Sequence, residues 1–181
     1  MKHPFRWVAL GVGVVVAILA VVLAVNVGTD PRAEYNTSVL LGKPAPNFEL
    51  TRFDGSKVTL ADLAGKTVIV NFWNSWCLPC REELPALQGW YGAHSGDDSV
   101  VMVGIPRDDS AARIRDAARA DSMGWAVKND RGAEAATLAY ATRGQPESFV
   151  INPNGIVVGS ILGPMGPRDL DRMARVGQGG R

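Results

Sequence analysis

The stretch VNFWNSWCLPCR, residues 70–81, contains both cysteines of this 181-residue chain, at i and i+3. A strand-like apolar run, Thr67–Trp73, precedes the cysteines, and a helix-like segment follows them. Two thiols one helical turn apart can form a disulfide without bending the backbone. The first thiol, Cys77, would lie at a helix N-terminus, where unpaired amides and the helix dipole stabilise a thiolate. We therefore expect Cys77 to ionise readily and to attack disulfides.

The next two positions of the motif fit the same redox chemistry. Pro79 falls in the first helical turn, where its missing N–H is not needed. Cys80 lies one turn inside the helix and is expected to be the shielded, resolving thiol. Half of a zinc site is the main alternative, but such a site needs about four ligands and the chain offers only His3 and His94 besides the two cysteines. An inert structural disulfide is the other alternative, although so short a loop would stabilise the fold weakly.

An apolar segment near the N-terminus, Val8–Val27, contains no charged residue and is long enough to span a bilayer as a helix. Lys2 and Arg6 precede it, and Asp30 is the first charge after it. The positive-inside rule then predicts a single-pass anchor in the cytoplasmic membrane, with the C-terminal domain on the extracytoplasmic side. A cleaved signal peptide ending near Ala24 remains the alternative.

The charge balance argues against a nucleic-acid partner, because 19 basic residues stand against 18 acidic ones and no basic patch is evident. The length suits one ordinary domain with an appendage. We divide the chain into four parts, listed here in order: a cytoplasmic stub and anchor over 1–27, a polar tether over 28–41, a globular domain over 42–176 and a disordered tail over 177–181.

Strand-like and helix-like segments alternate along the globular domain, which predicts an α/β fold with a mixed central sheet flanked by helices. Asp54-Gly55 marks a hairpin near the start of the domain. The expected elements are buried strands over 67–73 and 99–105, helices over 78–91, 109–122, 133–140 and 167–176, a short strand over 125–127, and a closing hairpin of 148–152 with 156–161.

Four segments together resemble the membrane-anchored thioredoxin-like proteins of the TlpA/ResA/CcmG (DsbE) type. They are GKPAPNF at 42–48, the motif-bearing stretch 70–85, GQPESFVI at 144–151, and the turn Asn154-Gly155. The resemblance runs from about Gly42 to Met173. It implies a thioredoxin fold with an N-terminal β-hairpin extension and a central insertion.

The resemblance also implies a client-binding surface. Pro146 would be preceded by a cis peptide bond and would lie beside the cysteines, and Gln145 would offer its backbone to a bound client strand. The alternative is an ordinary trans proline in a turn. Trp76, directly before Cys77, can shield the nucleophile with a flat apolar ring. We expect Trp76 and the Gln145-Pro146 loop to frame the surface that receives the client.

One position departs from the thioredoxin pattern. Ordinary thioredoxins place a buried aspartate in the active-site strand, where it serves proton transfer to the resolving thiol, and this chain has Asn71 there. Glu147 is our candidate for that role, since a buried carboxylate could exchange protons with Cys80. The alternative is that Glu147 faces solvent or caps local backbone. Glu82 and Glu83 are interpreted as surface charges that complement the helix dipole.

The dipeptide between the cysteines, Leu78-Pro79, carries no charge and resembles that of the reducing members of the family. We therefore expect a thiol–disulfide oxidoreductase, acting as a reductase in cytochrome c maturation or related metalloprotein assembly, with no cofactor and no metal. Its client would be an apocytochrome c or a copper-site assembly protein with a cysteine pair. Its electrons would come from a CcdA- or DsbD-like membrane protein. A dithiol oxidase and a non-catalytic copper-binding assembly protein are the alternatives.

Overall fold

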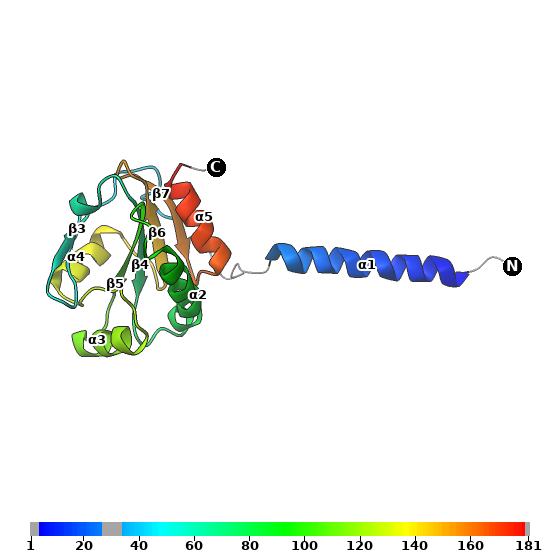
Figure 1. Ribbon diagram of the computed structural model, residues 1–181, viewed down its shortest axis with the longest axis horizontal. Helices are drawn as coiled ribbons and strands as arrows, with labels where there is room; N and C mark the ends of the chain where they lie inside the picture. The colour runs from blue at the N-terminus through cyan, green and yellow to red at the C-terminus, as the bar shows by residue number, and fades with distance from the viewer. Residues whose placement is uncertain (1–3, 27–33, 180–181) are drawn as a thin grey trace.

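The computed structural model describes residues 4–26 and 34–179, with side chains described for 11–23 and 34–179 (Figure 1). The helices are α1 Pro4–Asn26, α2 Leu78–His94, α3 Ala111–Ala120, α4 Arg131–Ala139 and α5 Pro167–Gly177, with a 3₁₀ turn η1 at Ala61–Leu63. The strands are β1 Glu34–Tyr35, β2 Glu49–Thr51, β3 Lys57–Thr59, β4 Thr67–Trp73, β5 Val100–Pro106, β6 Glu147–Ile151 and β7 Val157–Leu162.

The main sheet is mixed and has the strand order β1-β7-β6-β4-β5, while β2 and β3 form a separate hairpin. β4 runs parallel to β5, and the other neighbours in the main sheet are antiparallel. Asn71 of β4 lies opposite Ser148 of β6 and Gly104 of β5. The prediction of an α/β fold with a mixed sheet flanked by helices is confirmed.

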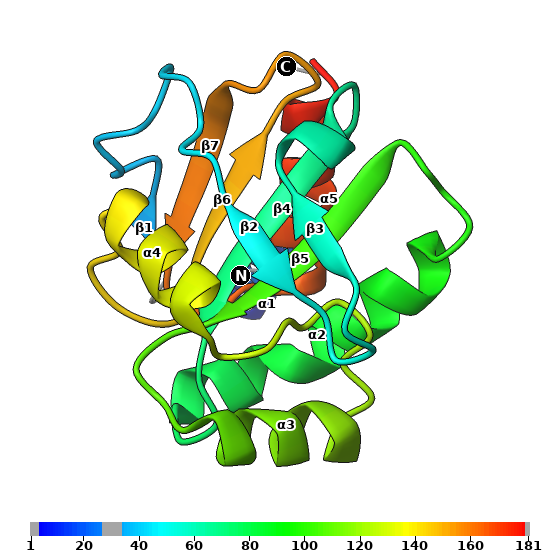
Figure 2. The same cartoon turned by 90° about the vertical axis from the view of Figure 1, so that its left-hand side faces the viewer.

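Strand β4 separates two apolar layers, because successive side chains of a strand point to opposite faces. Ile69 and Trp73 pack with the layer that includes residues of α2, α3 and α5. Val68, Val70 and Phe72 pack with α4 and the β2–β3 hairpin. Figure 2 shows the hairpin and α4 in front of the sheet and α5 behind it. Asn71 alternates with Val70 and Phe72, so it is the polar member of the row that faces α2.

Two segments differ from the expected elements. The stretch expected to be an irregular tether contains β1, whose two residues pair with the edge strand β7. Tyr35 of β1 donates a hydrogen bond to Asp169 of α5 over 2.6 Å, which ties this strand to the domain. The short strand expected over 125–127 is reduced to isolated bridges, one of them between Ala126 and Gly104. The division of the chain at 27, 41 and 176 stays a prediction.

The expected membrane anchor over Val8–Val27 is not supported. Helix α1 overlaps this stretch, and a helix needs about 20 apolar residues to cross a bilayer. Within the described part of the chain, no helix has the combination of length and apolar character that a membrane span requires. The prediction of a single-pass location in the cytoplasmic membrane therefore does not hold.

Candidate active site

The two cysteines form a disulfide at the start of α2. Cys77 is the N-cap residue, with extended backbone, and its Sγ accepts a hydrogen bond from the backbone N–H of Cys80 over 3.1 Å. Pro79 occupies the first turn, as the sequence predicts. Cys77 is 4 % exposed and Cys80 is 6 % exposed, so the disulfide form does not show the expected contrast between an exposed and a shielded sulfur.

The loop before β6 lies against the first sulfur. The Gln145–Pro146 peptide bond is cis, as the resemblance implies. The carbonyl oxygen of Gln145 lies 3.6 Å from Cys77 Sγ, close enough to accept a hydrogen bond from this thiol once the disulfide is reduced. Arg107, which follows β5, donates from Nη1 to Gln145 Oε1 over 2.9 Å. The structure therefore brings together Cys77, Gln145 and Pro146.

Two apolar side chains next to the disulfide are exposed. Trp76 is 56 % exposed and Leu78 is 67 % exposed, while the sulfurs between and below them are buried. The Trp76 ring is held at one edge, because its Nε1 donates to the carbonyl oxygen of Asp108 over 3.3 Å. An exposed aromatic ring with a fixed orientation next to a reactive disulfide suits contact with another polypeptide.

Glu83 is not a surface charge, and this corrects the sequence interpretation. Its side chain lies on the buried face of α2 and the residue is 2 % exposed. Oε1 accepts from Asn71 Nδ2 over 3.0 Å, and Oε2 accepts from the backbone N–H of Met165 over 3.0 Å. Burial raises the pKa of Glu83 to about 8, because removal from water penalises the charged form more than these two hydrogen bonds favour it. Its neighbour Glu82 is exposed, as expected.

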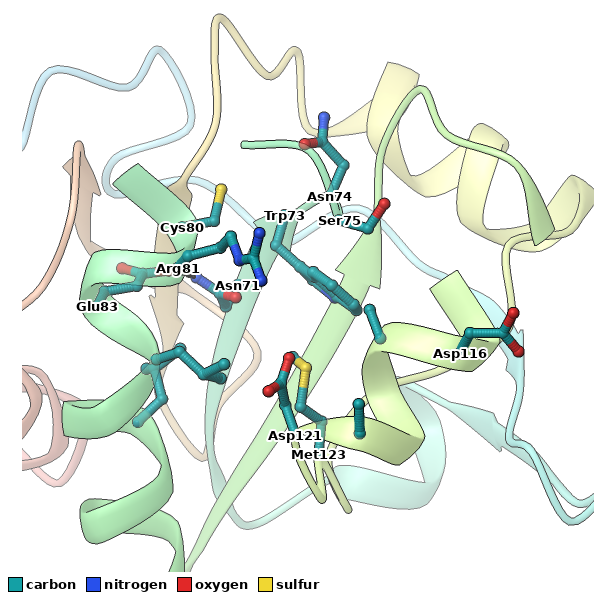
Figure 3. A pocket seen from close by; sticks show the side chains of 14 residues that line it. Asn71, Trp73, Asn74, Ser75, Cys80, Arg81, Glu83, Asp116, Asp121 and Met123 are labelled. Carbon is teal, nitrogen blue, oxygen red and sulfur yellow. Dashed lines mark hydrogen bonds between the residues drawn. The ribbon is translucent and has the colours of Figure 1, made fainter. Parts of the chain in front are cut away.

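A pocket of about 340 Å³ between α2 and α3 reaches both Cys80 and Glu83 (Figure 3). Asn71 also lines this pocket and is fully buried, and its Nδ2 also donates to Ser148 Oγ over 3.0 Å. Asn71 thus links Glu83 to Ser148 of β6 through its amide group, and this amide, unlike a carboxylate, does not titrate. The pocket is lined by Asn71, Trp73, Asn74, Ser75, Cys80, Arg81, Glu83, Leu84, Leu87, Asp116, Ala117, Ala120, Asp121 and Met123.

Glu147 is buried, but the structure does not bring it to the sulfurs. It lies opposite Phe72 in the sheet register, whereas its neighbour Ser148 lies opposite Asn71. Its carboxylate therefore shares the α4 face of the sheet with Phe72 and not the face that carries the disulfide. Arg143 engages it twice, through its backbone N–H at 2.7 Å and through Nε at 3.6 Å.

A sequence signal for Glu83 was present. The buried residues of α2 are Cys80, Glu83, Leu87 and Trp90, at spacings of three and four residues. This is the spacing of one helix face, so Glu83 stands in a row of core positions one turn below Cys80. A carboxylate inside an apolar stripe marks a buried acid and not a charge that complements the helix dipole.

The zinc-site and copper-binding alternatives both require several metal ligands to lie close together. Among the residues that the structure describes, no three or more His, Cys, Asp or Glu side chains are grouped so that they could hold a metal ion. His94 is the last residue of α2, at the opposite end of the helix from Cys77, and it stacks on Trp90 with ring centroids 4.1 Å apart.

Comparisons with known proteins agree with this geometry. A protein-family model described as the AhpC/TSA family matches residues 41–160. The thiol-disulfide oxidoreductase ResA of Bacillus cereus is 31% identical over 131 residues, which cover 72% of this chain and 75% of that protein. The crystal structure of StoA from Bacillus subtilis is 27% identical, with a TM-score of 0.62 over 71% of this chain and 96% of that one. The thioredoxin domain of a thiol-disulfide oxidoreductase from Bacteroides vulgatus is 25% identical, with a TM-score of 0.65 over 76% of this chain and 99% of that one.

Proposed function

We propose that this chain reduces disulfides in client proteins. The proposal starts from its identity: the chain belongs to the AhpC/TSA family and is a thiol–disulfide oxidoreductase of the ResA and StoA type. The observation that carries the proposal is the placement of the Cys77–Cys80 disulfide, with the Gln145 carbonyl on one side of it and a buried carboxyl, Glu83, one helical turn below it.

In the proposed reaction, the Cys77 thiolate of the reduced chain attacks the client disulfide. A bond forms between Cys77 and one client sulfur, and the other client sulfur leaves as a thiolate. Cys80 then loses its proton and attacks the Cys77 sulfur, which releases the second client thiolate and leaves the Cys77–Cys80 disulfide. Two electrons pass from the chain to the client. Trp76 and the backbone of Gln145 hold the client strand, with Pro146 shaping the loop.

Glu83 is the group that we assign to the proton of Cys80. The two residues are three positions apart on one face of α2 and line the same pocket. In the disulfide form, the pKa of about 8 keeps Glu83 protonated near neutral pH. It can therefore donate a proton to Cys80 when an electron donor opens the disulfide, and its carboxylate can take that proton back when Cys80 attacks the mixed disulfide. Asn71 positions Glu83 for both steps.

The groups around the sulfurs support electron transfer from this chain to its client. Leu78 and Pro79 add no charge between the cysteines, and an uncharged carboxyl below Cys80 does not stabilise thiolates as a cation would. With no cation beside the sulfurs, the reduced dithiol is stabilised less than it is in a strong oxidant, which supports the chain acting as a reductant. In a dithiol oxidase, the protein would have to stabilise the reduced, thiolate form of the cysteine pair.

The client class that we propose is a protein with a cysteine pair, either the haem-binding Cys-x-x-Cys-His segment of an apocytochrome c or a copper-site assembly protein. The exposed ring of Trp76 and the exposed Leu78 next to a buried disulfide support a polypeptide client over a small thiol. We further propose that a CcdA- or DsbD-like membrane protein returns the electrons.

The test is an equilibrium titration of the full chain against glutathione, together with trapping of a disulfide-closed Cys-x-x-Cys-His peptide by a Cys80→Ser variant. We expect a midpoint potential near that of thioredoxin, about −270 mV, and a mixed disulfide at Cys77. A potential near about −120 mV would make the chain an oxidase. Alkylation of the reduced chain should label Cys77 before Cys80, and the reverse order would overturn the assignment of the nucleophile.

A further inference from the structure

The short loop between β4 and α2, residues 74–76, presents Cys77 but has no regular structure of its own. Its backbone is held from outside by a single carboxylate, that of Asp109. Oδ2 of Asp109 accepts from the backbone N–H of Ser75 over 2.8 Å and from Ser75 Oγ over 2.6 Å. The side chain of Asp109 has no exposed surface, although the residue as a whole is half-buried, so its bonds to Ser75 are largely shielded from water.

The second oxygen of Asp109 is also fully engaged. Oδ1 accepts from the backbone N–H of Ser110 over 2.7 Å and from Arg113 Nε over 2.9 Å. Burial alone would raise the pKa of Asp109, but the hydrogen bonds from Ser75, Ser110 and Arg113 together lower it below its ordinary value. The carboxylate is therefore ionised at neutral pH and makes charge-assisted bonds to two separate segments.

The residues before Asp109 contact the other parts of the client-binding surface. The Asp108 carbonyl accepts from Trp76 Nε1, and Arg107 donates to the Gln145 side chain. The backbone of Arg107 is in turn paired with the end of β4, because its N–H donates to the Trp73 carbonyl over 2.8 Å. Residues 107–110 thus join the segment that precedes Cys77 to the loop that precedes Pro146.

We propose that Asp109 is a positioning residue for client reduction: it fixes the β4–α2 loop so that Cys77 and the Gln145 backbone meet the same client strand. This inference rests on the proposed function, because it concerns how a polypeptide is received at that site. A small disulfide needs only an accessible sulfur, whereas a client strand must reach Cys77 and Gln145 together. Loss of the carboxylate should therefore slow the reaction with a peptide far more than the reaction with a small disulfide.

The experiment compares Asp109→Asn with Arg113→Ala in the full chain. The second variant removes the outer ion pair and leaves both bonds to Ser75. The rate of thiol–disulfide exchange is measured with a Cys-x-x-Cys-His peptide in both directions. The reduced chain reacts with the peptide disulfide, and the oxidised chain reacts with the peptide dithiol. The reaction of the reduced chain with hydroxyethyl disulfide is measured for comparison. We expect Asp109→Asn to lower the peptide rates roughly tenfold and the hydroxyethyl disulfide rate less than about twofold. Arg113→Ala should change all rates less than about twofold.

A matched pair of variants at Ser75 keeps the inference testable if Asp109→Asn does not fold. Ser75→Ala removes the hydroxyl bond and keeps the N–H bond, so it should lower the peptide rates by a smaller factor. Ser75→Thr keeps a hydroxyl and should restore them. Equal losses with the peptide and with hydroxyethyl disulfide, or unchanged peptide rates, would overturn the role of Asp109. A wild-type chain that only oxidises the peptide dithiol would instead overturn the proposed function. In that case, the ratio of the peptide oxidation rates of Asp109→Asn and the wild type would still test the role of Asp109.

Discussion

Two of the buried acidic residues of this domain, Glu147 and Glu83, lie on opposite faces of the same sheet and are held in different ways. Glu147 lies on the α4 face and meets a cation, the Arg143 guanidinium, as well as a backbone N–H. Glu83 lies on the α2 face and meets only neutral donors, the Asn71 amide and the Met165 N–H. Both residues are almost wholly removed from water, at 1 % and 2 % exposure. Burial alone therefore does not distinguish the two groups, but the charge of the partner does.

The partners of Glu83 bear on whether it can exchange a proton. A carboxyl that is held by neutral donors has no cation to compensate for its removal from water. Desolvation therefore raises the pKa of Glu83 to about 8, within reach of a thiol. The group that we propose for proton exchange thus lies on the face that also carries Cys80, whereas Glu147 on the other face contacts Arg143.

The largest effect is expected for Glu83→Gln on the reduction of the disulfide form. In the wild type, the rate at a fixed concentration of attacking thiolate should fall as the pH rises through about 8, because Glu83 then loses the proton that Cys80 needs. The variant should lack this inflection and should react roughly tenfold to hundredfold more slowly near neutral pH. Stopped-flow mixing with dithiothreitol measures both quantities. Glu82→Gln, a change at the exposed neighbour, is the control, and an unchanged inflection in Glu83→Gln would refute the assignment.

The same variant should change how the stability of the disulfide form depends on pH. The folded pKa of Glu83, about 8, lies above the ordinary value of 4.5, so the folded chain keeps a proton that the unfolded chain releases between these values. The stability contributed by Glu83 is therefore present below about pH 4.5 and is lost as the pH rises to about 8. Urea unfolding at about pH 5 and about pH 8 should show a wild-type decrease that Glu83→Gln lacks, on the order of a few kcal/mol. Identical slopes in both chains would contradict a raised pKa.

On the other face of the sheet, removal of the cation should cost stability without affecting the chemistry. Arg143→Ala leaves the buried Glu147 carboxylate with one backbone donor, and we expect the free energy of unfolding to fall by about 1–2 kcal/mol at neutral pH. The double variant, Arg143→Ala with Glu147→Gln, should lose less free energy of unfolding than the two single variants lose together, because no uncompensated charge is then buried. Strict additivity in denaturant titrations would show that the two side chains do not interact.

The smallest effect is expected for Glu147→Gln on the redox reaction itself. Because the sheet separates Glu147 from the sulfurs, the rate of disulfide reduction should stay within about twofold of wild type, with the inflection near pH 8 retained. The dithiothreitol assay used for Glu83→Gln measures it. A shifted inflection would show that Glu147 is coupled to the cysteines after all and would remove the distinction between the two faces.

The parts of the site that lie along one stretch of sequence could be predicted. The apolar run before Cys77 and the proline in the first turn specify a strand, a helix N-terminus and the disulfide. The choice between Glu83 and Glu147 depended on which face each side chain occupies. In β6 every residue is buried, so no alternation of polar and apolar residues shows which face Glu147 takes. In α2 the stripe through Cys80 and Leu87 did contain that information, and its acidic member was mistaken for a surface charge.

The contribution of Asp109 could not be predicted for a different reason. It lies 34 residues from Ser75 in the chain, and the bond between them exists only because β4 and β5 are parallel neighbours whose ends meet at one edge of the sheet. The local sequence predicts only that a helix begins at about Asp109, whereas α3 begins at Ala111 and leaves Asp109 in the loop before it. The short strand β1 was missed because two residues leave no periodic pattern, and only its pairing with β7 defines it.

Strand β1 also determines how the domain would behave without its N-terminal segment. It covers the outer edge of β7, and Tyr35 gives the buried Asp169 one of its hydrogen bonds. A chain shortened to begin at Gly42 would expose the N–H and C=O groups of β7, which are a template for strand pairing with another copy. Such a shortened chain should self-associate through this edge. We therefore expect the two residues of β1 to protect the domain against aggregation, although they lie outside the segment that resembles thioredoxin-like proteins.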